Sequence, residues 1–231
     1  MSYNVPSLTA AQIRHRTLFT QIYAWMGGGL ALTGVIALWA YSSNLIVDLI
    51  TSGMFFGLIV GEIILVLALS WGINRMSIGV ATGAFLLYAA LNGLTMAVIF
   101  LAYTASSIGV TFLVTAGTFA AMSIYGYTTK RDLSTTGSLL IMALFGLILG
   151  TIANLFLRSE VLYWVITYAG VLIFTGLVAY DTQKIKLLSD QMAGSEETPQ
   201  FRRAVILGAL KLYLDFINLF LFLLRILGKR R

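Results

Sequence analysis

The stretch that decides the fold is residues 76–129, MSIGVATGAFLLYAALNGLTMAVIFLAYTASSIGVTFLVTAGTFAAMSIYGYTT, which carries no charged side chain. About 20 consecutive apolar residues cross the hydrocarbon core of a bilayer, so this run is long enough for two spans. Residues 18–47 form a second charge-free run, long enough for one span. These runs identify an integral membrane protein.

The composition agrees with this class. The chain has 231 residues, of which 59% are hydrophobic and 10% charged, and its mean hydropathy is +0.91. A soluble domain is usually about 25% charged, and one core could not bury so much apolar surface. A bilayer accepts that surface because apolar side chains can face lipid.

The hydrophobic pattern predicts an all-α membrane protein of seven transmembrane helices, with the spans at residues 18–40, 51–72, 80–101, 108–128, 134–157, 161–181 and 205–227. We expect three parts: a cytoplasmic leader (residues 1–17), a transmembrane domain (residues 18–228) and a basic tail (residues 229–231). The first apolar run starts too late and is too long for a cleavable signal peptide. Residues 182–204 are polar, contain turn-forming residues, and are expected to form the one sizeable loop.

The distribution of Lys and Arg predicts the orientation. Placing the N-terminus in the cytoplasm puts nearly all basic loop residues inside, namely Arg14, Arg16, Arg75, Lys130, Arg131, Lys184, Lys186, Arg202 and Arg203. Only Arg158 falls in an outer loop. Lys229, Arg230 and Arg231 oppose this bias, so the last segment either crosses or re-enters. Its length favours crossing.

Ionisable residues within the spans are the informative positions, because a charge in the membrane is costly and usually faces a partner or a water-filled cavity. Five qualify: Glu62, Asp181, Lys211, Asp215 and Arg225. In the seventh span, six residues, four of them polar, recur at three- and four-residue steps and share one helical face. This stripe is Gly208, Lys211, Asp215, Asn218, Phe222 and Arg225. We expect it to face the interior of the bundle.

Two carboxylates that meet in a low-dielectric site cannot both ionise cheaply, and they tend to share a proton. Such a pair can sense pH and, once deprotonated, attract a cation. Two carboxylates are too few for a tight calcium site, which needs roughly 6–8 oxygens, but transient binding suits conduction. The alternative is an internal salt-bridge network, for example between Asp215 and Lys211.

Small residues in the second span form a separate stripe. Gly53, Gly57 and Gly61 recur at four-residue spacing, which permits close helix approach. We expect this stripe to pack within the molecule, and a dimer face is the alternative.

Motifs for catalysis or cofactor binding are missing from the sequence. There are no cysteines, and the single histidine, His15, precedes the first span, so no Ser-His-Asp set or zinc motif is formed. We therefore expect no enzyme activity and no cofactor. The net charge of +6 reflects loops that face anionic lipid and the cytoplasm, and no nucleic-acid partner is expected.

Three segments together resemble the Bax inhibitor-1 family of membrane proteins. They are GALKLYLDFINLF at residues 208–220 with Leu223, Leu224 and Arg225 following, YDTQKI at residues 180–185, and GYTTKRDL at residues 126–133. The resemblance extends from about residue 20 to residue 228. The short tails are similar to those of bacterial inner-membrane members.

The resemblance implies a seven-helix bundle with the last helix at its centre, acting as a pH-sensitive calcium leak channel in the inner membrane. The sensor would be Asp181 with Asp215, which would also contact calcium weakly and transiently. Glu62 and Arg225 match residues implicated in gating. Calcium ions, protons and the lipid bilayer are thus the expected partners, with calcium as permeant ion.

Two positions depart from the family pattern. A member with an ionic lock has an arginine at the inner end of the second span, where this chain has Ile73, with Arg75 nearby. Lys211 replaces a residue that is more often small and polar. A cation one turn from Asp215 would favour the ionised carboxylate and compete with a metal ion for it.

Two other functions remain open. Family members are associated with stress survival, and some with membrane proteolysis. The chain could therefore regulate a membrane protease or stress-response complex through the 182–204 loop or the leader. A secondary transporter is disfavoured by the lack of sequence repeats and interrupted helices.

Overall fold

The computed structural model describes residues 10–192 and 198–231, with side chains described from residue 18 onward. Within these ranges, seven helices are long and apolar enough to cross a membrane. They are α1 (Ala10–Ser42), α3 (Met54–Gly72), α4 (Ile78–Met96), α6 (Ala105–Thr128), α7 (Ser134–Leu157), α8 (Glu160–Gln191) and α9 (Pro199–Leu227). Three short helices join them: α2 (Leu45–Thr51), η1 (Ile73–Arg75) and α5 (Val98–Ala102). The predicted all-α architecture with seven transmembrane helices is confirmed.

Hydroxyl side chains mark the start of four of the long helices. The hydroxyl oxygen of the residue before each helix accepts a hydrogen bond from a backbone N–H of the first turn. Such first-turn N–H groups have no acceptor within the helix. These capping residues are Ser77, Thr104, Ser159 and Thr198. Pro199 follows Thr198 in the first turn of α9, where its missing N–H costs nothing.

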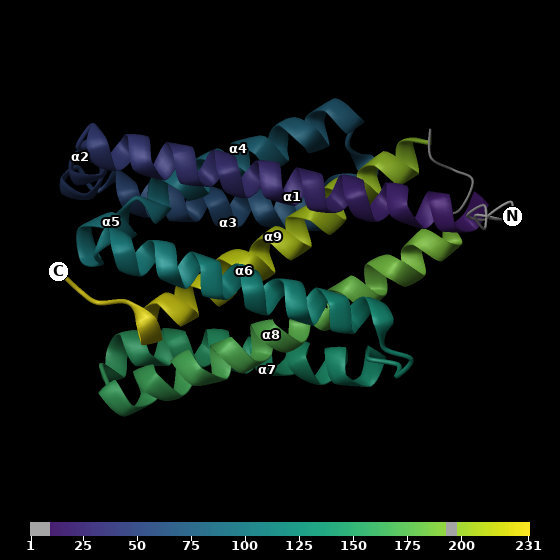
Figure 1. Ribbon diagram of the computed structural model, residues 1–231. Coiled ribbons are helices and arrows are strands. Elements are labelled where there is room, and N and C mark those ends of the chain that lie inside the picture. Colours follow the sequence, from purple (N-terminus) through teal and green to yellow (C-terminus); the bar gives the residue numbers. More distant parts are fainter. Residues whose placement is uncertain (1–9, 193–197) are drawn as a thin grey trace, which may run out of the picture.

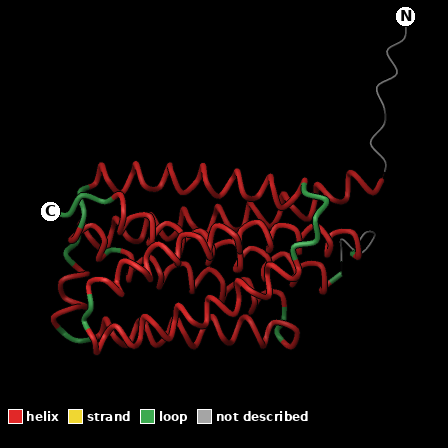
Figure 2. Tube along the Cα trace, turned by 90° about the horizontal axis from the view of Figure 1, so that it is seen from below, coloured by secondary structure: helices red, strands yellow, loops and turns green. Residues whose placement is uncertain are grey.

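The helix α9 lies at the centre of the bundle, as expected. It packs against α1, α4, α6 and α8 and crosses the other helices obliquely (Figure 1). Its Leu212, Tyr213 and Leu219 are fully buried. The ends of the long helices gather at the two ends of the bundle (Figures 1 and 2). The start of α1 and the end of α9 lie at opposite ends, so the last segment crosses the bundle.

The helices α8 and α9 are longer than predicted, which corrects the expected loop at residues 182–204. Helix α8 continues to Gln191 and α9 begins at Pro199, so only residues 192–198 connect them. A hydropathy pattern marks the hydrocarbon core, but a helix can continue beyond the core into water. Asp181 is therefore inside α8, more than two turns before its end. Gly194, Ser195, Glu196 and Glu197 lie outside the described residues.

The glycine stripe in α3 does not pack within the molecule, so that expectation was wrong. A Cβ atom at Gly57 or Gly61 would meet nothing within 4 Å. Gly53 precedes α3 with φ of 76°, a conformation that glycine adopts without strain. The close approach lies elsewhere, because a Cβ at Gly126 in α6 would collide with the backbone of Ala179 in α8.

Candidate functional site

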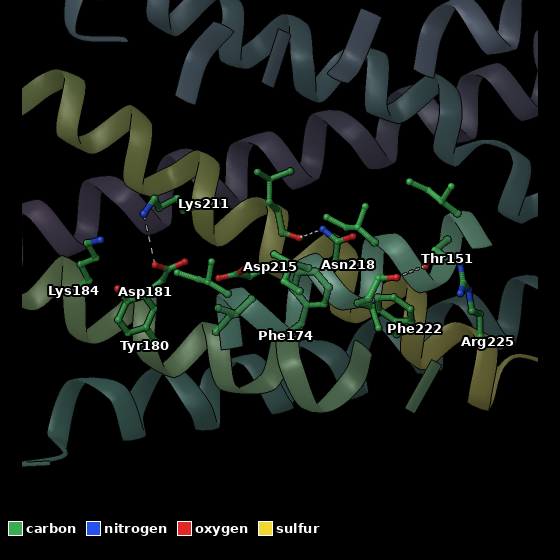
Figure 3. A pocket seen from close by; sticks show the side chains of 17 residues that line it. Thr151, Phe174, Tyr180, Asp181, Lys184, Lys211, Asp215, Asn218, Phe222 and Arg225 are labelled. Atoms are coloured by element: carbon green, nitrogen blue, oxygen red, sulfur yellow. Dashed lines mark hydrogen bonds and ion pairs between the residues drawn. The ribbon is translucent and has the colours of Figure 1, made fainter. Parts of the chain in front are cut away.

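The crossing of α8 and α9 brings Asp181 and Asp215 together in the interior (Figure 3). Asp215 is only 5% exposed, and the Asp181 side chain is 13% exposed. Figure 3 shows their carboxyl groups beside one another, one from each helix. The Oδ2 atom of Asp215 is buried and lacks a hydrogen-bond partner among the described residues. Since an ionised carboxylate only accepts hydrogen bonds, two carboxyl groups in contact are stable when they hold one proton between them.

A lysine from α9 completes this site. The Nζ atom of Lys211 lies 3.7 Å from Oδ1 of Asp181 on α8. An internal ion pair is thus present, as the salt-bridge alternative expected, but its carboxylate is Asp181 and not the Asp215 of the example. Lys211 and Asp215 are one turn apart on the same face of α9. The lysine side chain extends across to the neighbouring helix, where Asp181 is the carboxylate nearer to water. The result is a three-residue site with two acidic groups and one cation.

A cavity of about 600 Å³ adjoins the site between α7, α8 and α9. The polar stripe of α9 faces it, as expected: Lys211, Asp215, Asn218, Phe222 and Arg225 all line its wall. Figure 3 shows these side chains in a row from Lys211 to Arg225. The Nδ2 atom of Asn218 donates to the carbonyl oxygen of Leu214 at 2.8 Å, which leaves the amide oxygen as an acceptor.

A second cavity of about 380 Å³ lies beside η1, between α8 and the first turns of α9. Asp181, Lys184 and Lys211 contribute to the walls of both cavities. The Lys211–Asp181 ion pair therefore stands where the two cavities adjoin. Gly208, the remaining member of the predicted stripe, lines the second cavity.

The structure also locates the two positions that depart from the family pattern. Ile73 is buried at the edge of the second cavity, while Arg75 is exposed. Neither supplies a cation to the aspartates. Lys211 does so from α9. In this chain the cation paired with Asp181 therefore comes from the seventh span.

Glu62 and Arg225 lie in separate surroundings. On α3, Oε1 of Glu62 accepts a hydrogen bond of 2.9 Å from the hydroxyl of Thr95 on α4. The guanidinium of Arg225 lies 5.0 Å from the ring centroid of Phe222 and 5.4 Å from that of Tyr163. Cation–π contacts hold Arg225 at the far end of the first cavity.

Several residues of the site had no role in the sequence-based prediction. Thr151 of α7 lines the first cavity, and Arg203 of α9 lines the second. Lys184 had been counted only as a positive loop residue. Its position three residues after Asp181 was an available signal, because residues three apart share a helical face.

The side chain of Gln183 bridges to the loop before α7, accepting from Leu133 N and donating to Arg131 O, both at 2.8 Å.

The acidic groups do not form a cage for a resident metal. Across residues 18–192 and 198–231, no group of three or more His, Cys, Asp or Glu side chains converges. The aspartate pair offers carboxylate oxygens at one point along a cavity, an arrangement suited to brief contact with a cation.

The fold and site define a class: seven-helix membrane proteins with an aspartate pair held by a central last helix. The family model for the inhibitor of apoptosis-promoting Bax1 matches residues 15–231. The chain therefore belongs to the Bax inhibitor-1 family, as its motifs had indicated.

Curated bacterial proteins support this assignment. The inner membrane protein YbhL of Escherichia coli is 52% identical over 94% of this chain and 93% of its own length. An uncharacterised protein of Borreliella burgdorferi is 45% identical over 91% of both chains. One of Rickettsia prowazekii is 42% identical over 94% of this chain and 91% of its own. The chain is accordingly a multi-pass membrane protein, and these names describe no enzyme activity.

Proposed function

We propose that this protein is a pH-sensitive calcium leak channel of the bacterial inner membrane, gated by Asp181 and Asp215. The observation that carries the proposal is the meeting of these two carboxyl groups from different helices in the bundle interior. A proton shared between them neutralises the site, and its loss leaves carboxylate oxygens that attract a divalent cation. The proton and the cation thus compete for the same atoms.

The surroundings of the pair support a gate. The two cavities adjoin at the Lys211–Asp181 ion pair. A permeating cation must displace Lys211 from Asp181 or pass while that contact is broken. The ammonium group therefore acts as a tethered competitor for the ion.

The orientation belongs to the same proposal. The end of the bundle that carries the start of α1 also holds Arg75, Lys130, Lys184 and Arg203. By the positive-inside rule this end is cytoplasmic. The second cavity then faces the cytoplasm, and Arg225 lies toward the outer surface.

Calcium flux into liposomes that contain the purified protein tests the proposal. Flux is measured with an enclosed calcium indicator across about pH 5 to 8, a range in which a coupled carboxylate pair can titrate. We expect flux above that of empty liposomes, dependent on pH, and a flat pH profile for Asp215→Asn. Flux no greater than in empty liposomes would contradict the channel, provided that the reconstituted protein is folded. Flux that keeps its pH profile in Asp215→Asn would contradict the gate.

A further inference from the structure

The first cavity has an opening that an ion pathway does not explain. Its α7 wall consists of Ile141, Leu144, Leu147, Ile148, Thr151 and Ile152. Three of these side chains are well exposed: Ile141, Ile148 and Ile152. Helix α7 packs chiefly along α8, so the space between α7 and α9 opens sideways toward lipid. Hydrocarbon, not water, is the medium outside this opening.

The cytoplasmic end of this opening is basic. Among the described residues that line the second cavity, Lys184, Arg203 and Lys211 are basic, and Asp181 is the single carboxylate. The Nε atom of Arg203 is buried and lacks a hydrogen-bond partner within the described part of the chain. A buried, unpaired donor is costly, so it marks a position where an acceptor is expected. Three cations against one anion give the described lining of this cavity an excess of positive charge.

The depth of the basic end matches the lipid headgroups. Helix α8 begins at Glu160, at the opposite surface. At about 1.5 Å per residue, roughly 20 residues cross a hydrocarbon core of about 30 Å. The inner boundary of the core thus falls near Asp181 and Lys184. Lysine and arginine side chains at this depth extend toward the phosphate level.

We infer that the protein binds one anionic glycerophospholipid of the cytoplasmic leaflet at this place. The phosphate contacts Lys184, Arg203 and Lys211, and an acyl chain lies in the first cavity against the apolar side chains of α7. Charge complementarity selects the headgroup, and the lateral opening admits the chain. The cavity volume of about 600 Å³ is within the usual range for ligand sites.

Lipid binding has a consequence for the ion pair. The phosphate and the Asp181 carboxylate compete for the same ammonium group of Lys211, so a bound lipid weakens the Lys211–Asp181 contact. The binding site itself does not depend on conduction, whereas an effect on the gate rests on the function proposed above.

Native mass spectrometry of the purified protein, titrated with phosphatidylglycerol or phosphatidylcholine, tests the binding site. We expect phosphatidylglycerol to bind about tenfold more tightly, since each nearby cation contributes a several-fold factor. The double variant Lys184→Gln/Arg203→Gln should lose this preference and keep the Lys211–Asp181 pair. The matched control Lys130→Gln/Arg131→Gln removes two charges from the same membrane side. It should keep the preference for phosphatidylglycerol.

A second variant separates the acyl-chain site from the charge. Ile148→Trp places a bulky side chain at the α7 wall and leaves every basic residue intact. We expect it to weaken phosphatidylglycerol binding, with thermal unfolding in detergent as the check on folding.

Three results would overturn the inference. The first is equal binding of the two lipids by the wild type. The second is an equal loss in the control and pocket variants, which would show a general surface charge effect. The third is displacement of the lipid by inorganic phosphate alone, which would show a site for small soluble anions. Absent calcium flux would contradict the channel but leave the lipid titration unaffected.

Discussion

Two acidic sites within the membrane differ in how the protein accommodates them. Asp181 and Asp215 meet across α8 and α9 with Lys211 at 3.7 Å, where two cavities adjoin. Glu62 is the one ionisable residue on α3, and its carboxyl group accepts a hydrogen bond of 2.9 Å from the Thr95 hydroxyl. The first site combines two carboxyl groups, a lysine ammonium group and adjoining cavities. At the second, the hydrogen-bond donor is a neutral hydroxyl.

The difference indicates separate roles. A carboxyl group with a neighbouring cation and an adjoining cavity can change state when a proton or ion arrives. A carboxyl group that accepts from a hydroxyl on the next helix acts as an interhelical contact. We therefore expect substitutions at the aspartate pair to change flux, and substitutions around Glu62 to change stability.

The largest expected effect is in a double-mutant cycle at the aspartate pair. Asp181→Asn and Asp215→Asn should each lower calcium flux about tenfold, corresponding to a loss of about 1.4 kcal/mol of cation stabilisation. Because the two residues act as one site, the double variant should fall little further. Flux of the three variants in liposomes measures this coupling.

The control for this cycle uses the other acidic site. Glu62→Gln keeps an oxygen that can accept from Thr95, and we expect its effect on flux to multiply independently with that of Asp215→Asn. Strong coupling between Glu62 and Asp215 would show that the two sites form one network, which would remove the contrast drawn between them.

A smaller change is expected from removing the cation. Lys211→Ser should raise calcium flux by about two- to fivefold, because the pair is partly solvated and such pairs contribute roughly 0.5–1 kcal/mol. Lys130→Ser, which removes an exposed charge from the same membrane side, should leave flux unchanged. Lower flux in Lys211→Ser would indicate that the lysine holds the site in shape and does not compete with calcium.

The contrast between the sites could be predicted only in part from the sequence. The polar stripe of α9 was predictable because helical periodicity places residues three and four apart on one face, and this face does line the first cavity. The meeting of Asp181 with Asp215 came from the family resemblance, since spacing along two different helices sets no distance between them. The partner of Lys211 was mistaken for the same reason: contact within one helix can be counted in residues, but contact across helices cannot.

The sequence predicted less well where a helix ends in water and which helix face remains open to lipid. The extension of α8 to Gln191 follows from hydrogen bonding that continues outside the hydrocarbon core, which hydropathy does not detect. The glycines of α3 gave a packing signal, yet Gly57 and Gly61 have open space beside them. Small residues permit close approach without requiring it.

Loss of the Thr95–Glu62 hydrogen bond should change the stability of the protein more than its calcium flux. Thr95→Val removes the hydroxyl that bonds Glu62 and should lower the free energy of unfolding by about 0.6 kcal/mol, the usual size of an interhelical hydrogen bond in membranes. Unfolding by a denaturing detergent measures the change. Thr118→Val is the matched control, because the Thr118 hydroxyl donates to the carbonyl of Val114 within its own helix. An equal loss in both variants would mean that the interhelical bond adds nothing.

The smallest effect is expected at a third acidic residue, Asp132, which lies on the surface before α7. Its Oδ1 atom accepts a bond of 2.8 Å from Ser134 N, and the side chain and backbone of Ser134 hold the pKa of Asp132 below its ordinary value. A carboxylate with a lowered pKa stabilises the fold above the unfolded-state pKa of about 3.9, and this contribution is lost as pH falls through the folded-state pKa.

Asp132→Ala should therefore reduce stability slightly at neutral pH, and the difference from wild type should vanish once the pH falls below the lowered folded-state pKa of Asp132. Thermal unfolding of both proteins in detergent, at neutral and at acidic pH, measures this convergence. A difference that persists in acid would assign the role of Asp132 to shape and not to charge. Asp132 at the surface and Glu62 in the membrane would then both act as acceptors for neutral donors, independently of their charge. The aspartate pair would differ from both because it has Lys211 and the adjoining cavities.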